Sequence, residues 1–250
     1  MEIVVREIRA KSILSRSGIP GVDYCVNPYV GCTHACRYCY ASFMKRFTAH
    51  TEPWGAFADA KVNAAEVLEK ELGRARAGSV MLSSVTDPYQ PLEERLGLTR
   101  RCLEALLRHR FPVDILTKSP LVLRDVDLLE GAAGVDVGIT VTTDDEEIRT
   151  IFEPGAPPIR ARLQALRELF ARGVRTYAFI GPILPMNPDR LAEELRPCTS
   201  YVYIDRMNYP KKTVGLYRSR KLDDWLDPDF SQEVLEQLVR GFPPDRVILC

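Results

Sequence analysis

The chain has 250 residues, of which 46% are hydrophobic and 27% charged, and its 34 basic residues balance its 34 acidic ones. These values are typical of a globular protein with one full hydrophobic core, and a net charge of zero favours neither a nucleic acid nor a membrane surface as partner. The odd count of seven cysteines indicates a reducing compartment rather than a disulfide framework. The charged N-terminus lacks an apolar signal core, and no stretch approaches the roughly 20 apolar residues of a membrane span. We therefore expect a cytoplasmic protein without a membrane partner.

Short apolar runs alternate with amphipathic segments along the chain. We expect strands at about 23–29, 79–84, 112–117, 135–141, 174–181 and 200–205. The spacing of leucines between them predicts helices at about 62–73, 99–110, 121–131, 145–152, 159–172 and 188–196. This alternation predicts a parallel sheet with right-handed crossovers, and six such units suit an α/β fold in the form of a partial (β/α)6 barrel. The pattern changes after residue 206, so we expect the barrel over 1–206 and a C-terminal extension or cap over 207–250, with a final helix at about 231–240.

Three cysteines lie within eight residues, with the spacing C-x3-C-x2-C: Cys32, Cys36 and Cys39. One loop of this kind can supply three thiolates to an iron–sulfur cluster. Three protein ligands leave one iron of a four-iron cluster free to bind a substrate or cofactor. Structural zinc is the alternative, but it needs a fourth ligand, for which the nearby candidates are Cys25, His34 and His50. We interpret Cys25 as a small buried residue of a strand and His34 as a loop residue beside the ligands.

Polar residues gather at the ends of the predicted strands, where parallel α/β barrels place their chemistry. They are Ser83, Ser84, Thr86 and Asp87 after the second strand, Thr117, Lys118 and Ser119 after the third, Thr140, Thr142 and Thr143 at the fourth, Gly181 and Pro182 after the fifth, and Asp205, Arg206 and Asn208 after the sixth. Because these ends share one edge of the sheet with the cysteine loop, we expect a site for a polar cofactor there. Ordinary alternatives exist, since Lys118 can be a solvated lysine, Asp87 a turn residue before Pro88, and the threonines simple strand formers.

The segment Asn27–Ala41, with the sequence NPYVGCTHACRYCYA, resembles the radical S-adenosylmethionine (SAM) enzymes, and within them the branch related to spore photoproduct lyase. Further segments in the same order strengthen the resemblance, which covers about residues 20–190: Ser83–Pro91, Leu116–Pro120 and Phe152–Gly155. The resemblance implies a [4Fe–4S] cluster on the three cysteines, with SAM on its free iron. The reduced cluster would cleave SAM to a 5′-deoxyadenosyl radical, which abstracts hydrogen from the substrate. An external reductant such as flavodoxin or ferredoxin is implied, and the substrate is a small molecule or is derived from a nucleic acid.

The resemblance also implies roles for single residues. Tyr38 would lie beside the adenine of SAM, Thr86 and Asp87 near its amino group, and Lys118 against its carboxylate. Thr140 or Thr142 matches the hydroxyl at the end of the fourth strand, and Gly181 and Pro182 would line the adenine through their backbone. The competing interpretation is a non-catalytic iron–sulfur or zinc protein that serves as a scaffold or electron carrier, which would not need polar residues at the strand ends.

Several positions depart from the family pattern or have two interpretations. Spore photoproduct lyase carries a hydrogen-donor cysteine three residues before the aspartate, where this chain has Ser84. An alcohol does not give hydrogen to a carbon radical as a thiol does, so we expect no efficient repair of the spore thymine dimer, with a tyrosine such as Tyr89 as a candidate quencher. Glu153 is interpreted first as the end of a helix, and the basic residues 211–221 as a solvated surface, with a functional role as the alternative for both.

Overall fold

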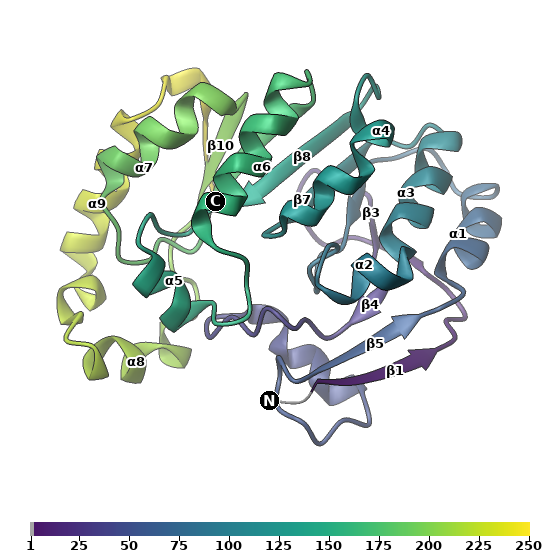
Figure 1. The fold of residues 1–250 in the computed structure, drawn as a ribbon, viewed down its shortest axis with the longest axis horizontal. Helices are drawn as coiled ribbons and strands as arrows, with labels where there is room; N and C mark the ends of the chain where they lie inside the picture. Colours follow the sequence, from purple (N-terminus) through teal and green to yellow (C-terminus); the bar gives the residue numbers. More distant parts are fainter. Residues whose placement is uncertain (1–2) are drawn as a thin grey trace.

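A computed structural model describes residues 3–250 and shows a twisted sheet with helices packed against it (Figure 1). Within these residues the main sheet has eight strands, in the order β2-β3-β6-β7-β8-β9-β10-β11. Their bounds are Leu14–Arg16 (β2), Tyr24–Val26 (β3), Val80–Leu82 (β6), Val113–Thr117 (β7), Val135–Thr140 (β8), Arg175–Ile180 (β9), Tyr201–Ile204 (β10) and Val247–Leu249 (β11). Neighbours from β3 to β11 pair in parallel, and β2 pairs antiparallel with β3. The predicted partial α/β barrel is confirmed.

The helices flank this sheet, and most of them cover its outer face and enclose the main core (Figure 1). Their bounds are Ala64–Leu72 (α1), Leu92–Leu96 (α2), Leu98–Arg108 (α3), Val126–Leu129 (α4), Glu146–Phe152 (α5), Ile159–Ala171 (α6), Pro188–Leu195 (α7), Val214–Ser219 (α8) and Pro228–Arg240 (α9). Strand β7 shows how the alternation works: Val113 and Ile115 are buried in the core, whereas Leu116 faces the inner side and lines a cavity. Apolar residues on alternate strand positions thus hold the helices, and the positions between them build the site.

A second, smaller sheet carries the start of the cysteine loop. It consists of β1 (Val4–Ile8), β5 (Phe57–Lys61) and β4 (Tyr29–Val30), with β5 in the middle, parallel to β1 and antiparallel to β4. None of these strands was predicted as a separate sheet. It lies beside the main sheet, at the end where the chain passes from β3 into β4 (Figure 1).

Two predicted elements differ from the structure. The strand expected at 23–29 breaks after β3, because Pro28 has no N–H to donate to a ladder and the side chain of Asn27 turns to the β6 end, where its Oδ1 accepts from Val85 N at 3.1 Å. The helix expected at 121–131 is a 3-10 segment (η2, Pro120–Asp125) followed by the short α4. There the buried Asp125 pairs with Arg100 Nη1 at 3.1 Å, so tertiary ion pairs hold a segment that local periodicity assigned to one helix.

The C-terminal residues 207–250 do more than cover the barrel. Helix α9 packs against α7, and β11 pairs in parallel with β10 from Val202 to Ile204, so this segment adds a seventh parallel strand to the sheet. Helix α8 and the preceding turn lie near the cysteine loop (Figure 1). No helix within residues 3–250 has the length and apolar character needed to cross a membrane.

Candidate active site

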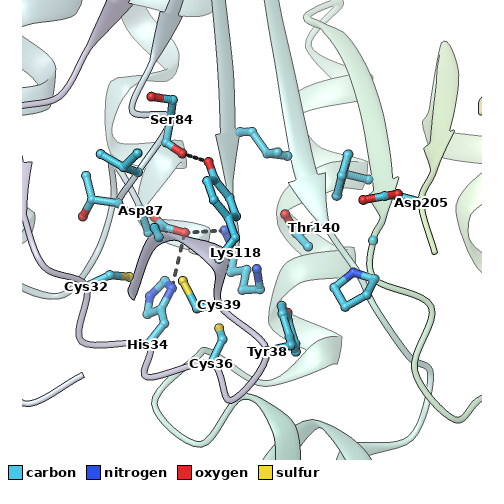
Figure 2. A pocket seen from close by; sticks show the side chains of 18 of the residues that line it. Cys32, His34, Cys36, Tyr38, Cys39, Ser84, Asp87, Lys118, Thr140 and Asp205 are labelled. Atoms are coloured by element: carbon cyan, nitrogen blue, oxygen red, sulfur yellow. Dashed lines mark hydrogen bonds and ion pairs between the residues drawn. The ribbon is translucent and has the colours of Figure 1, made fainter. Parts of the chain in front are cut away.

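The three cysteines open onto one cavity at the carboxyl ends of the parallel strands. Cys32, Cys36 and Cys39 line it together, and its volume is about 310 Å³ (Figure 2). The loop that carries them is held from both sides. Gly155 N donates to His34 O at 3.0 Å, and a Cβ at Gly155 would lie 2.2 Å from Thr33 O. On the other side Gly31 has a φ of +90° and approaches Phe57 O of β5 so closely that a Cβ would lie 2.5 Å from it. Only glycine fits both contacts.

Thr86 and Gln90 fasten the first half of the cysteine loop. Thr86 Oγ1 donates to Gly31 O at 2.6 Å, and Gln90 Nε2 donates to the same carbonyl at 3.2 Å. Gln90 Oε1 accepts from Thr33 N at 3.2 Å. Thr86 lines the cavity, but its hydroxyl hydrogen is directed at the loop. Its proximity to a bound SAM amino group stays a prediction.

Asp87 joins three segments that surround the cavity. Its Oδ1 accepts from Thr117 Oγ1 at 2.6 Å, and its Oδ2 accepts from Lys118 N at 2.8 Å and lies 3.3 Å from His34 Nδ1 (Figure 2). Burial by itself would raise the pKa of Asp87, but His34 and these hydrogen bonds outweigh burial and lower the pKa to about 2. The carboxylate therefore stays ionised and ties the cysteine loop to the ends of β6 and β7.

Glu153 is the centre of a fully buried charge cluster behind the cavity. Its Oε1 accepts from Tyr38 OH and, at 3.0 Å, from Thr142 Oγ1, while its Oε2 lies 2.6 Å from Arg162 Nη2. Burial opposes ionisation, but Arg162 and Lys118 lower the pKa of Glu153 to about 2. Arg162 also donates to Thr140 O at 3.2 Å. Glu153 therefore does not merely end a helix, since it fixes the ring of Tyr38 within the cysteine motif.

Lys118 supplies the cation that the cavity offers to a ligand. Its Nζ lies 3.8 Å from Glu153 Oε1, too far for a hydrogen bond, and 5.8 Å from the centre of the Tyr38 ring. Burial lowers the pKa of Lys118, but the neighbouring Cys36 and Glu153 outweigh burial and raise the pKa above its ordinary value. The ammonium thus stays charged and keeps donors free for an anionic group in the cavity.

The remaining predicted residues divide between the cavity and the core. Thr140, Gly181 and Pro182 line the cavity, whereas Thr142 is buried behind it with its hydroxyl on Glu153. Of the two threonines, the geometry places Thr140 in reach of a ligand. The expectation that Tyr89 reaches a radical is wrong, because Tyr89 is fully buried in the core and does not line the cavity.

Other candidates for a fourth ligand lie away from the cavity or are engaged. Cys25 is buried in β3, as predicted. His50 is buried between Glu52 and Asp59, at 2.9 and 2.8 Å, and does not line the cavity. His34 lines it, but its Nδ1 faces Asp87.

A second wall of the cavity lies across from the cysteines and follows β10. It consists of Asp205, Arg206, Met207, Asn208 and Tyr209. Asn208 Nδ2 donates to both carboxylate oxygens of Asp205, at 2.9 and 3.0 Å, and burial raises the pKa of Asp205. Figure 2 shows Asp205 and Thr140 on this side and the cysteines on the other. The cavity thus has a sulfur-bearing end and a polar end.

The donors present fit a thiolate-bound cluster together with a polar ligand. Three thiols come from one loop, and burial raises the pKa of Cys36 to about 12 even though Lys118 opposes it, so metal binding there must displace protons. Two buried atoms on residues of the cavity wall, His34 Nε2 and Ser83 Oγ, have no hydrogen-bond partner within residues 3–250. Buried polar atoms are normally paired, so these two atoms are available for hydrogen bonds to a ligand in the cavity.

A family model for the radical SAM superfamily matches residues 26–197, more than half of the chain. The chain belongs to the radical SAM superfamily. Enzymes of this superfamily typically use a [4Fe–4S] cluster and SAM. An uncharacterized protein of Methanocaldococcus jannaschii is 33% identical over 233 residues, which cover 92% of this chain and 85% of that protein. The radical SAM Nα-GlyT isomerase of Pseudomonas phage M6 is 25% identical over 160 residues, which cover 63% of this chain and 32% of that protein.

Solved radical SAM structures share the fold. Spore photoproduct lyase in complex with dinucleoside spore photoproduct has a TM-score of 0.71 at 15% identity, covering 98% of this chain and 82% of that one. A variant of the lyase with bound AdoMet and dinucleoside spore photoproduct has a TM-score of 0.66 at 14% identity, covering 96% of this chain and 78% of that one. At this identity the likeness shows the fold alone.

Sequence reasoning undervalued or missed several residues of this radical SAM site. Glu153 was undervalued and Arg162 was missed, although a signal existed: Arg162 occupies the apolar face of α6 beside Leu163 and Leu166. A charged residue on a buried helix face needs a partner. Tyr40 was also missed. It follows the last cysteine, lines the cavity and donates its hydroxyl hydrogen to Ser84 O.

Proposed function

We propose that this chain is a radical SAM enzyme that cleaves SAM reductively at a [4Fe–4S] cluster on Cys32, Cys36 and Cys39 and abstracts hydrogen from a substrate in the adjoining cavity. The observation that carries this proposal is the shared cavity, because the three thiols and the polar ends of five strands face the same 310 Å³ space. The bound cluster and SAM would supply the electron transfer and the hydrogen abstraction. A scaffold or electron carrier would have no use for such a space.

The chain's own residues would bind and orient the cofactor. Lys118 keeps a charged ammonium at the cavity wall and suits the carboxylate of SAM. Tyr38 is held in one orientation by Glu153 and presents its ring to the cavity beside the last cysteine. Thr140 adds a hydroxyl on the floor, and Gly181 leaves its backbone accessible, since a Cβ there would lie 2.3 Å from the Phe179 ring.

We further propose that the substrate is a nucleic-acid base or a nucleotide. This proposal is supported by the polar wall opposite the cysteines, where Asp205 offers a carboxylate acceptor and Arg206 a cationic donor to a base edge, while Asn208 holds the carboxylate in place. The neighbouring Tyr209 is half exposed at the cavity and suits a base-stacking contact. The solved spore photoproduct lyase complex holds a dinucleoside at the same fold.

The test is anaerobic reconstitution followed by measurement of iron and of 5′-deoxyadenosine. We expect about four irons per chain in the wild-type protein and SAM cleavage after reduction. The alanine variants of Cys32, Cys36 and Cys39 should each lose both properties. Cys25→Ala is the matched control, because Cys25 is a buried cysteine of the same sheet end that does not line the cavity, and it should keep both. Stoichiometric zinc without iron under strictly anaerobic conditions would contradict the proposal.

A further inference from the structure

A basic surface lies beside the cysteine loop, and among its cations within residues 3–250 Arg206 alone lines the cavity. Residues 206–221 contain six basic residues and no acidic one, in a chain whose net charge is zero: Arg206, Lys211, Lys212, Arg218, Arg220 and Lys221. All six are exposed, unlike the buried or half-buried Arg100, Arg124 and Arg162, which pair with carboxylates. None of the six has a carboxylate within 4.0 Å in residues 3–250. Their charge is therefore available to a partner.

Three cations converge on one groove at this surface. Arg37, Lys212 and Arg220 line it together with Thr150, Ile151 and Leu216. The lining combines cationic and aliphatic side chains, and no acidic or aromatic side chain of residues 3–250 is part of it. Such a combination suits an acidic protein partner, because opposite charges guide the encounter and apolar side chains add contact area.

The groove is directly connected to the cysteine loop. Arg37 lies between Cys36 and Cys39 in the sequence and is exposed. Lys212 Nζ donates to Cys39 O at 2.6 Å and to Ser42 Oγ at 2.8 Å, so the basic segment is bonded to the backbone of a cluster ligand. None of the three cations lines the substrate cavity. A partner bound in the groove would thus reach the cluster while the substrate cavity stays occupied.

We propose that this groove, formed by Arg37, Lys212, Arg220, Ile151 and Leu216, docks an acidic one-electron donor protein of the flavodoxin type. The proposal rests on the proposed function, because only a redox-active cluster needs such a donor. Cys32, Cys36 and Cys39 would hold the cluster, which would take up one electron from the reduced flavin with no bond made or broken in this chain. Arg37 lines the groove and belongs to the same loop as Cys36 and Cys39, so a donor bound there would lie beside the segment that carries two of the proposed cluster ligands.

A nucleic-acid strand would also seek cations, but the groove suits it less well. Sequence-tolerant binding of single strands relies on aromatic side chains for base stacking, and the groove's lining offers isoleucine and leucine instead. An acidic protein surface with an apolar centre matches the lining in both charge and chemistry. Binding of a nucleic acid is therefore one of the outcomes that the test distinguishes.

The test measures reduction of the reconstituted cluster by stopped-flow absorbance, with photoreduced flavodoxin or with dithionite as reductant. Arg220→Glu should slow reduction by flavodoxin about tenfold or more at low salt, because rim charges act mainly on the association rate. High salt should narrow that difference. Dithionite, which needs no docking surface, should reduce both proteins alike. The matched control is Lys70→Glu, which makes the same charge change on the exposed end of α1, on the opposite side of the molecule (Figure 1).

Several results would overturn the proposal that this groove docks a donor protein. Equal rates with flavodoxin for Arg220→Glu and wild type would do so, and so would an equal slowing by Lys70→Glu, which would show an effect of overall charge. If Arg220→Glu loses binding of a single-stranded oligonucleotide but keeps its rate with flavodoxin, the surface is a phosphate site instead. Arg220→Ala serves if the reversal disturbs folding, with a smaller slowing expected. If the reconstituted protein has no iron–sulfur absorbance that dithionite can bleach, the proposed function fails together with the docking surface. If dithionite bleaches the absorbance but flavodoxin reduces both proteins equally fast, only the docking surface fails.

Discussion

The buried pair of Glu153 and Arg162 should be the most sensitive point behind the cofactor end of the cavity. The change Glu153→Gln keeps the side-chain shape and the acceptor for Tyr38 and Thr142 but leaves the guanidinium of Arg162 without a counter-charge, with both residues fully buried. Breaking a buried ion pair on one side costs about 3–5 kcal/mol. The fall of the Glu153 pKa from 4.5 to about 2 gives a similar figure of roughly 3 kcal/mol.

Differential scanning calorimetry or thermal circular dichroism of the reconstituted protein measures this loss. For a chain of this length about 1 kcal/mol corresponds to about 2 °C, so we expect Tm to fall by about 6–10 °C. The control is Glu194→Gln, which removes an exposed pair with Arg167 and should cost at most about 1 kcal/mol. The double variant Glu153→Gln with Arg162→Met should recover part of the loss, because it removes the unpaired charge.

The pH dependence of the difference in Tm between wild type and Glu153→Gln gives a second test. The folded-state pKa of Glu153 is lowered, so its contribution to stability is fully present above about pH 4.5 and is lost as the pH falls toward 2. The gap in Tm between wild type and Glu153→Gln should therefore be constant from pH 7 to about pH 5 and narrow in more acidic buffers. A Tm within about 2 °C of wild type at pH 7, or a gap that widens in acid, would refute the reasoning.

Three further predictions concern the cavity. Lys118→Ala should weaken SAM binding in isothermal titration by about 10- to 100-fold, since a charge-assisted pair is worth about 1.5–3 kcal/mol. The iron content should stay unchanged. Equal SAM affinity of the variant and the wild type would show that Lys118 has only a structural role. Thr140→Val should weaken SAM binding, whereas Thr142→Val should cost only about 1 kcal/mol of stability through the lost bond to Glu153, and the reverse pattern would show that the two residues are misassigned. The wild-type protein should not turn over dinucleotide spore photoproduct, because Ser84 lines the cavity where this repair needs a thiol as hydrogen donor. Multiple turnovers by the wild-type protein would contradict this prediction, and turnover gained only in Ser84→Cys would support it.

Features set by short spacing in the chain could be predicted from the sequence. The cysteine loop is defined within eight residues, and the strand ends follow from alternating apolar runs, so the cavity-lining Lys118, Thr140 and Gly181 were found without a structure. The small sheet of β1, β4 and β5 was not found, because β4 has two residues and depends on the turn at Pro28 for its direction. Pairing of that kind is decided by tertiary contacts rather than by local propensity.

Hydrogen bonds between residues far apart in the chain were harder to predict from the sequence. Glu153 meets Tyr38, which is 115 residues away, and Lys212 meets Cys39 across 173 residues. Each residue alone is compatible with a solvated surface or a helix end, which is how both were first interpreted. The one usable sign was Arg162 on the buried face of its helix. A search for charges on apolar faces, followed by a search for their counter-charges, would have indicated this cluster.

The contacts of the cysteine loop also have a consequence for the order in which the molecule is made. The loop leaves the ribosome early, but it is held by Gly155 and Phe152, whose backbone groups bond to His34 and Arg37, and by Lys212 near the end of the chain. Proteins fold during synthesis from the N-terminal side, so the loop lacks these later contacts until the chain is nearly complete, although Thr86 and Gln90 can hold its first half earlier. If the proposed cluster forms, its site would therefore be complete only late in synthesis. A nascent protein stalled before residue 150 would lack the contacts that Gly155 and Lys212 make with the loop.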